Sequence, residues 1–435
     1  MMTTQPRRWL TLLALAGGYF VDQGEAQTMS VLFPAIRQAL NLGYGALGQI
    51  AGWQNIVQSL SAPLWGFLAD RVSRKWIVVF GTGVWGVWTF ACGFASSFAE
   101  LFWLKVIAGI GLGCLLPPTF SMLADLFKPE ERGRANGLLG SAGFIGIIVS
   151  VLTLGWLVTV PDLGWRWGFF VVGGASILSG IIIALFVKEP PRGAAEPELA
   201  GKITTTDAQR FHIRAADVLE ILRIPTMWVT FAQGIFGVTP WVVMGAYFVT
   251  WLVDERGIAI GAAPTVFAVI IIGQAIAQSL GGFIADWMHR RDPLRGRIIV
   301  SQFSILNGVW LTTFIFTTRL DFIALVIVAL VMGCLIGWAG KGGRDPILQA
   351  VLRPELRSTA WAIATAIEGA LAALAAFLAG WLAEAYGLAF AMLACVPGSW
   401  FLLFLCWFGY YVTFPRDAAR LRAAMAARRE QLALR

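Results

Sequence analysis

Charged side chains inside otherwise apolar segments are the residues of this chain that could do chemistry. Asp22 and Glu25 lie in the middle of one such segment, three positions apart, so a helix would place both carboxylates on one face. A carboxylate within a membrane costs about 3 kcal/mol to insert and usually marks the path of a solute or a proton. Both are therefore candidates for proton exchange, and we favour Glu25, the more central of the two. The alternative is a structural pair with Lys105 or a polar neighbour.

Lys105 is the cation of a second apolar segment, and it precedes a run of glycines that ends at Pro117-Pro118. The glycines predict close helix packing, and the prolines predict a bend. A desolvated lysine gives up its proton more readily than an arginine does, and it attracts anions. We therefore interpret Lys105 as a candidate contact for an anionic solute. The alternative is that its side chain extends to the outer membrane interface.

A third polar group interrupts the apolar segment that ends near residue 352. Glycines followed by Pro346 predict a discontinuous helix that exposes backbone near a binding site. Lys341 and Arg344 could hold an anionic group there, with Asp345 or Glu368 as partners; the alternative is a set of ion pairs at the cytoplasmic mouth. Amide side chains in two other segments either line a cavity or form packing hydrogen bonds: Gln54, Gln58 and Gln274.

The composition places these charges in a membrane. Of 435 residues, 58% are apolar and only 13% are charged, which is too few for the polar surface of a soluble protein of this size. Apolar runs near the 20 or so residues that span a bilayer recur throughout the chain. The spans are predicted at 9–38, 44–69, 76–97, 100–127, 134–160, 166–188, 226–253, 262–288, 297–318, 321–352, 357–386 and 389–414. The sequence thus predicts an all-α polytopic membrane protein with twelve transmembrane helices.

The distribution of cations predicts the topology and the domains. Most of the 33 lysines and arginines lie before the first span, in the even-numbered loops and after the last span, so we expect both termini in the cytoplasm and the chain in the inner membrane. The net charge of +8 thus reflects orientation rather than nucleic-acid binding. We expect a six-helix bundle at 1–188, a cytoplasmic linker at 189–224, a second bundle at 225–414 and a basic cytoplasmic tail at 415–435, near anionic lipid.

A repeated loop motif supports two related halves. Gly66-Phe-Leu-Ala-Asp70-Arg71 continues to Arg74-Lys75 after the second span, and a weaker copy from Gly282 through Asp286 to Arg290 follows the eighth. A second pair of loops, Pro129–Ala135 and Pro354–Ala360, aligns at a similar offset. The motif resembles the loop between helices 2 and 3 of the major facilitator superfamily (MFS) of secondary transporters. The resemblance implies two pseudo-symmetric six-helix bundles.

The resemblance also implies a latch between the bundles that favours the outward-facing state. Asp70 would face the positive end of a helix of the other half, and the loop cations would pair with acids such as Asp125 or Glu131. The positive loop alone is the alternative interpretation. The latch candidates are Gly66, Asp70, Arg71, Arg74, Lys75, Asp125, Arg132, Gly282, Asp286, Arg290 and Arg357.

By this resemblance the chain is expected to move a small organic solute, an anion or metabolite, by alternating access coupled to protons. Asp22 and Glu25, with the helix-4 glycines, resemble proton symporters for organic acids, whereas Tyr19–Asp22 and Arg357–Ala360 are similar to spinster-like carriers. Alternatives are an exporter of lysolipid-like or drug-like amphiphiles and a sensor that does not transport. We expect a monomer in the lipid bilayer, no enzyme activity, no cofactor, no metal site and no nucleic-acid partner. Substrate, direction and the titrating carboxylate are not set by the sequence.

Overall fold

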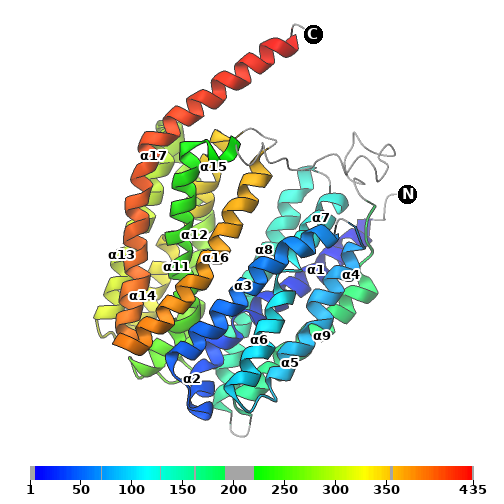
Figure 1. The fold of residues 1–435 in the computed structure, drawn as a ribbon, viewed down its shortest axis with the longest axis vertical. Coiled ribbons are helices and arrows are strands. Elements are labelled where there is room, and N and C mark those ends of the chain that lie inside the picture. The colour runs from blue at the N-terminus through cyan, green and yellow to red at the C-terminus, as the bar shows by residue number, and fades with distance from the viewer. Residues whose placement is uncertain are drawn as a thin grey trace. The chain divides into compact units, whose positions relative to one another are not determined.

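The computed structural model describes residues 5–69, 71–127, 129–160, 163–191, 220–352 and 356–433, with the side chains of some residues inside these ranges left out. Helices account for nearly all of this part of the chain, and it contains no strand. Their order along the sequence is shown in Figure 1.

The first six spans are built from ten helical elements. The first, third and fourth spans are each divided, whereas the other three are single helices. In chain order they are α1(Gln5–Glu25) with α2(Thr28–Leu40), α3(Tyr44–Ala69), α4(Arg74–Val78) with the π-helical turn η1(Val79–Val84) and α5(Gly86–Cys92), α6(Phe98–Leu112) with α7(Leu116–Leu126), α8(Pro129–Thr159) and α9(Gly164–Phe186).

The second six spans contain one divided helix, the tenth. In chain order they are α11(Pro225–Asp254), α12(Ala263–Arg291), α13(Gly296–Thr317), α14(Phe322–Leu335) with the π-helical turn η3(Ala339–Arg344) and α15(Asp345–Val351), α16(Arg357–Tyr386) and α17(Leu388–Ala433). The predicted interruption of the tenth span at its glycines is therefore present. The predicted tail continues α17 as one helix through Pro415.

Local sequence accounts for several helix ends. The hydroxyl of Ser97 caps α6 by accepting a hydrogen bond from the backbone N–H of Glu100. Asp321 caps α14 in the same way through Ala324. Helix α2 ends at Asn41, which adopts the left-handed conformation with φ 51°. The break between α1 and α2 contains neither glycine nor proline. Instead, the Thr28 hydroxyl donates a hydrogen bond of 2.7 Å to the carbonyl of Glu25.

The surface of the helices is apolar, as expected of a protein surrounded by lipid. Within the described ranges, nine helices are long and apolar enough to cross a membrane. Large apolar side chains on their outer sides are strongly exposed, for example Phe283 at 76% and Trp156 at 61%. A water-soluble monomer rarely exposes so much contiguous apolar surface. The chain is therefore an integral membrane protein made of helices, as predicted.

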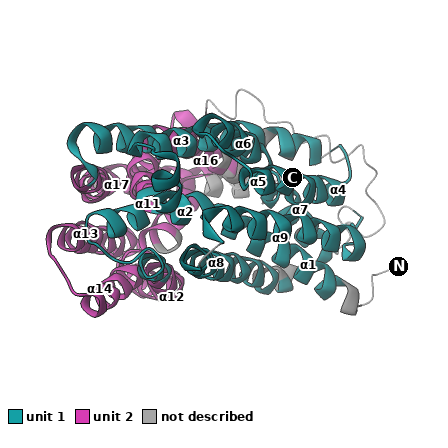
Figure 2. Ribbon diagram, turned by 90° about the horizontal axis from the view of Figure 1, so that it is seen from below, with its two compact units in different colours: residues 1–211, 245–268, 376–388 teal, residues 212–244, 269–375, 389–435 magenta. Residues whose placement is uncertain are grey.

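The chain groups into two compact units, coloured separately in Figure 2. Unit 1 contains Met1–Phe211 together with Gly245–Ala268 and Ala376–Leu388, so the first six spans pack with the end of α11, the start of α12 and the end of α16. Unit 2 contains His212–Met244, Val269–Ala375 and Ala389–Arg435. The four-part division expected from the sequence, with boundaries at 188, 224 and 414, stays a prediction.

Candidate functional site

Among the acidic side chains of unit 1 that the structure describes, Glu25 is the best enclosed. It is the last residue of α1, it is only 5% exposed, and its Oε1 accepts a hydrogen bond from the Thr89 hydroxyl of α5. Ser176 of α9, whose hydroxyl donates to the carbonyl of Thr82, lies beside this carboxylate, and Lys105 of α6 interacts with it electrostatically. Four elements thus converge on one carboxylate, as a buried charge requires.

Lys105 is more deeply buried than Glu25. Its exposed fraction is 1%, so the side chain stays inside the bundle and does not extend to the outer interface. The electrostatic interaction with Glu25 is the compensation available to the ammonium group there. The structure thus brings together a candidate proton-exchanging group and a candidate anion-binding group, which lie 80 positions apart in the sequence.

Asp22 lies one helical turn before Glu25 and is less enclosed. Its carboxylate accepts a long hydrogen bond of 3.4 Å from the side chain of Gln23 and interacts electrostatically with Glu25. The structure therefore places both predicted carboxylates in one electrostatic cluster. Lys105 interacts electrostatically with Glu25, although the two side chains form no direct ion pair.

Close packing of α1 against α8 holds the end of α1 in place. The Ser150 hydroxyl donates a hydrogen bond of 2.9 Å to the carbonyl of Gly24. A Cβ atom added to Gly146 would lie 2.1 Å from the carbonyl oxygen of Phe20, so only glycine fits at this crossing. The position of Glu25 thus depends on a glycine contact that sequence reasoning did not identify.

The amides predicted in the second span pack against α6. A Cβ on Gly109 would lie 3.0 Å from Cγ of Gln54, and one on Gly113 would lie 3.0 Å from the carbonyl oxygen of Gln58. The glycines after Lys105 therefore allow α6 to approach α3 closely, as expected. A substrate-lining role for the two amides stays a prediction.

Unit 2 contains a cavity of about 290 Å³ near the interrupted tenth span. Its polar lining includes three amides and two charged groups, and its apolar lining includes three tryptophans. The polar residues are Gln233, Gln274, Gln278, Arg344 and Asp345; the tryptophans are Trp241, Trp361 and Trp400. Three of the predicted cavity residues, Gln274, Arg344 and Asp345, thus line one cavity. The side chain of Lys341 lies outside the described part of the chain.

One of the residues that line this cavity, Arg344, forms an ion pair. Arg344 pairs with Glu368 of α16, and the two side chains are only 15% and 14% exposed. In the amide orientation that satisfies both of its neighbours, Gln233 accepts a hydrogen bond of 3.0 Å from Nε of Arg344. Glu368 lies eleven residues into α16, about 16 Å along the helix, so the pair is well inside the span. Sequence reasoning had named both residues, with ion pairs at the mouth as the alternative.

Arg74 organises the predicted cytoplasmic end of unit 1. Its side chain is almost fully buried, and it contacts Asp125 of α7, the Ser121 hydroxyl at 2.9 Å and Oε1 of Glu189 at 3.0 Å. The predicted contact between Arg74 and Asp125 is therefore present. Burial alone would raise the pKa of Glu189, but hydrogen bonds from Ser73 and Arg74 outweigh it and lower that pKa.

The other latch candidates of this loop differ in their surroundings. The guanidinium of Arg71 lies 3.4 Å from the centre of the Phe67 ring, and the ammonium of Lys75 lies 5.3 Å from that of Trp76. Glu131 is bound by both terminal nitrogens of Arg8, at 2.7 and 2.9 Å. Asp70 lies outside the described residues, as do the side chains of Arg132 and Arg357 and the surroundings of Gly66.

The second copy of the loop motif is more open. Asp286 pairs with Arg297 at 2.6 Å, and Arg290 is exposed. A Cβ on Gly282 would meet nothing within 4 Å, so this glycine mediates no close helix contact among the described residues.

A polar cluster at the opposite end of unit 1 was not anticipated from the sequence. Arg37 of α2 pairs with Asp254 at the end of α11, and the Tyr44 hydroxyl donates to the same carboxylate at 3.0 Å. Glu384 of α16 accepts a hydrogen bond of 3.0 Å from the backbone N–H of Gly45. The sequence did not predict this cluster, because its members come from spans that are far apart in the sequence.

Comparison with known proteins identifies the family to which this chain belongs. The model of the Major Facilitator Superfamily matches residues 15–340, and the chain belongs to this family. Its membership confirms the predicted family and agrees with the prediction that the chain is not an enzyme. It is 26% identical over 282 residues to the probable sulfoacetate transporter SauU of Cupriavidus necator, and this match covers 63% of the chain and 64% of that protein.

A second relative and one solved structure are also similar to the chain. The chain is 24% identical over 314 residues to the probable galactarate/D-glucarate transporter GudP of Escherichia coli, covering 66% of the chain and 68% of that protein. The crystal structure of a bacterial homologue of the human lysosomal transporter spinster, in an inward-facing and unoccupied conformation, superposes with a TM-score of 0.80 at 20% identity, covering 95% of this chain and 99% of that one. This last likeness concerns the fold: twelve helices in the MFS arrangement.

Proposed function

We propose that the chain is a secondary active transporter that moves a small organic anion across the membrane by alternating access, coupled to protons. Membership of the Major Facilitator Superfamily supports a transporter. Two of its relatives are named as probable transporters of sulfoacetate and of galactarate and D-glucarate, which are small acids that carry a negative charge at each end. These matches each cover about two thirds of the relative, so the substrate class rests also on the charges of this chain.

The observation that carries the proposal is the buried pair of Lys105 and Glu25. Without a substrate, the two buried side chains attract each other electrostatically inside unit 1 without forming a direct ion pair. An anion that binds Lys105 leaves Glu25 without its compensating charge, and an unpaired buried charge is strongly unfavourable. A proton on Glu25 removes this penalty. Anion binding and protonation thus favour each other, which is the requirement for coupled transport.

The remaining site assignments follow from this mechanism and are proposals. Asp22 would pass protons to or from Glu25. The cavity of unit 2 would supply Arg344, with Gln274 and Asp345 beside it and Glu368 as its resting partner. The latch loops would favour one state of the cycle through Asp70, Arg74 and Asp125. We further propose a monomer in the inner membrane with both termini in the cytoplasm.

Reconstituted protein tests the proposal directly. The wild-type protein is placed in liposomes that contain a pH-sensitive dye, and sulfoacetate, D-glucarate and other organic acids are added one at a time. We expect proton movement that depends on one of these anions and is lost in Glu25→Gln. Glu100→Gln is the matched control, because that carboxylate is exposed at the start of α6, and it should transport normally.

The outcomes separate the parts of the proposal. Anion uptake without proton movement would contradict the coupling role of Glu25 but would still support an organic anion as the substrate. If no organic anion moves in the wild-type protein, while a labelled lysolipid or drug-like amphiphile does, the substrate class is wrong. Binding of a solute without flux would indicate a sensor.

A further inference from the structure

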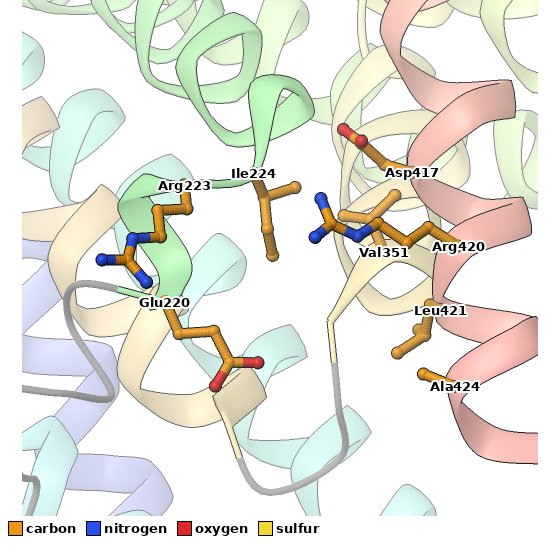
Figure 3. Close-up of a pocket in the computed structure, with 8 residues that line it drawn as sticks. All are labelled: Glu220, Arg223, Ile224, Val351, Asp417, Arg420, Leu421 and Ala424. Carbon is orange, nitrogen blue, oxygen red and sulfur yellow. The ribbon is translucent and has the colours of Figure 1, made fainter. Parts of the chain in front are cut away.

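A second cavity of unit 2, of about 410 Å³, lies apart from the one around Arg344. Its walls come from the short segment before α11, the end of α15 and the part of α17 after Pro415 (Figure 3). The lining residues are Glu220, Arg223, Ile224, Val351, Asp417, Arg420, Leu421 and Ala424. No step of the proposed transport cycle uses them.

Two carboxylates, Glu220 and Asp417, and two guanidinium groups, Arg223 and Arg420, line this cavity. Glu220 has an interaction partner of its own. Asp417 accepts hydrogen bonds from the backbone N–H of Thr226 at 2.8 Å and from its hydroxyl at 2.6 Å. It therefore caps the positive N-terminal end of α11, and this contact uses its charge. Arg223 and Arg420 are exposed, and neither forms an ion pair within the described part of the chain. Figure 3 shows the Arg420 side chain extending from α17 toward Ile224.

The opposite side of the cavity is apolar. Ile224, Val351, Leu421 and Ala424 contribute hydrocarbon surface from three different elements. A ligand that fits both features carries an acidic group for the arginines and a hydrocarbon part for these side chains. Small inorganic anions satisfy only the first requirement.

Two markers place the cavity at the level of lipid headgroups. Val412 of α17 is an apolar side chain with 56% exposure, and Arg416, one turn later, is exposed and charged. On α11, Trp228 is 57% exposed and its indole N–H donates to the carbonyl of Leu222 at 2.8 Å, which is typical of an interfacial tryptophan. Arg420 lies about 6 Å beyond Arg416 along the helix, within a headgroup layer roughly 5–8 Å thick.

We propose that this cavity binds an anionic glycerophospholipid. The phosphate lies against the guanidinium groups of Arg223 and Arg420, and the glycerol and the upper part of an acyl chain lie against Ile224 and Leu421. Charge-assisted hydrogen bonds from arginine to phosphate are among the stronger ones in proteins. Arg416 and Arg422 on the same helix raise the local concentration of anionic lipid without entering the cavity.

Native mass spectrometry of the full-length, delipidated protein tests this site. Phosphatidylglycerol is titrated against the wild type, Arg223→Gln, Arg420→Gln and Arg422→Gln, with phosphatidylcholine and inorganic phosphate as separate arms. We expect the affinity for phosphatidylglycerol to fall about tenfold in Arg223→Gln and in Arg420→Gln, the loss of about one charge-assisted contact. Arg422→Gln, which removes one charge from the same helix outside the cavity, should change it less than about twofold.

Three results would overturn the proposal. An equal loss in Arg422→Gln would mean that diffuse charge attracts the lipid. Equal binding of phosphatidylcholine would show that the acidic head group is not recognised. If inorganic phosphate binds in place of the lipid, the two arginines form a site for a free anion and not for a phospholipid. If Arg420→Gln lowers the thermal stability, Arg420→Lys is used in its place. This variant keeps the charge and should retain most of the binding of phosphatidylglycerol.

Discussion

Arg37 in the last turn of α2 forms an ion pair with Asp254, the final residue of α11, although 217 positions separate them. The Arg37 guanidinium also lies 4.1 Å from the centre of the Tyr44 ring, and Tyr44 donates to the same aspartate. The pair therefore ties the first six spans to the seventh at the end that is predicted to face outward. A transporter that opens to this side must break the contact, so the pair is a candidate outer gate.

Neutralising this gate should favour the state in which it is open. With spin labels on the exposed Gln38 and Glu255, we expect Arg37→Gln and Asp254→Asn each to add a longer component to the distance distribution. Arg166→Gln is the control, because Arg166 donates to the carbonyl of Ala95 and lies over the Trp165 ring, and both partners belong to the first six spans. A distribution that does not differ between the gate variants and the control would contradict a gating role.

Removing the hydroxyl that binds Glu25 should impair coupling without abolishing it. Thr89→Val keeps the shape of the side chain but leaves Glu25 without one charge-assisted hydrogen bond, worth about 1.5–3 kcal/mol. We expect anion uptake to fall about three- to tenfold and its pH profile to shift. Thr89→Ser should restore both. Uptake by Thr89→Val that matches the wild type at every pH would argue against the assignment of Glu25.

For the Arg344–Glu368 pair, we expect opposite effects when either charge is removed. If a substrate anion competes with Glu368 for Arg344, Glu368→Gln should tighten anion binding about tenfold, and Arg344→Gln should remove it. Trp241 and Trp400 line the same cavity, so quenching of tryptophan fluorescence can report binding. Equal weakening by the two variants would instead identify a purely structural ion pair.

Two glycines of α8 should respond oppositely to alanine. Gly146 has no room for a Cβ against Phe20, whereas Gly140 has open space within 4 Å. We expect Gly146→Ala to destabilise the protein by about 1–3 kcal/mol and Gly140→Ala to stabilise its helix by about 0.5–1 kcal/mol. Thermal unfolding in detergent measures both. A Gly146→Ala variant that unfolds at the same temperature as the wild type would mean that α1 can shift away from α8.

The network around Arg74 should depend on pH through Glu189. The pKa of Glu189 is lowered from 4.5 in the folded protein, so its contribution to stability is present above pH 4.5 and is lost as the pH falls through the lowered value. We expect Glu189→Gln to lower the melting temperature at pH 7, and this difference from the wild type to vanish under acidic conditions. A difference that stays constant down to pH 3 would show that the effect is not ionic.

Much of the fold could be predicted from the sequence, because lipid imposes a simple rule on span length. The predicted spans 226–253 and 357–386, for example, correspond to α11 and α16 within one or two residues. The interruption of the tenth span followed from its glycines and Pro346. The break after Glu25 did not, because a single glycine, Gly24, precedes it with no proline, and the Thr28 hydroxyl satisfies the carbonyl that it exposes.

For the candidate sites too, some residues could be predicted from the sequence and others could not. Intramembrane charges such as Glu25, Lys105 and Arg344 stand out because apolar neighbours surround them in the sequence. Their partners are set by tertiary packing, and neither Thr89 nor Asp254 differs in any local feature from other residues of its type. The Arg74–Asp125 contact was predictable because Arg74 follows the second predicted span and Asp125 lies at the end of the fourth, on the same predicted side.

The continuity of α17 has a mechanical consequence. Its 46 residues form one helix that extends about 26 Å beyond Arg416, to Ala433. If the transmembrane part of α17 tilts by about 10°, the far end moves by about 5 Å, so the tail acts as a lever that amplifies small motions of its bundle. A fluorophore near this end would report the transport cycle in real time, and a protein bound there would be displaced with every turnover.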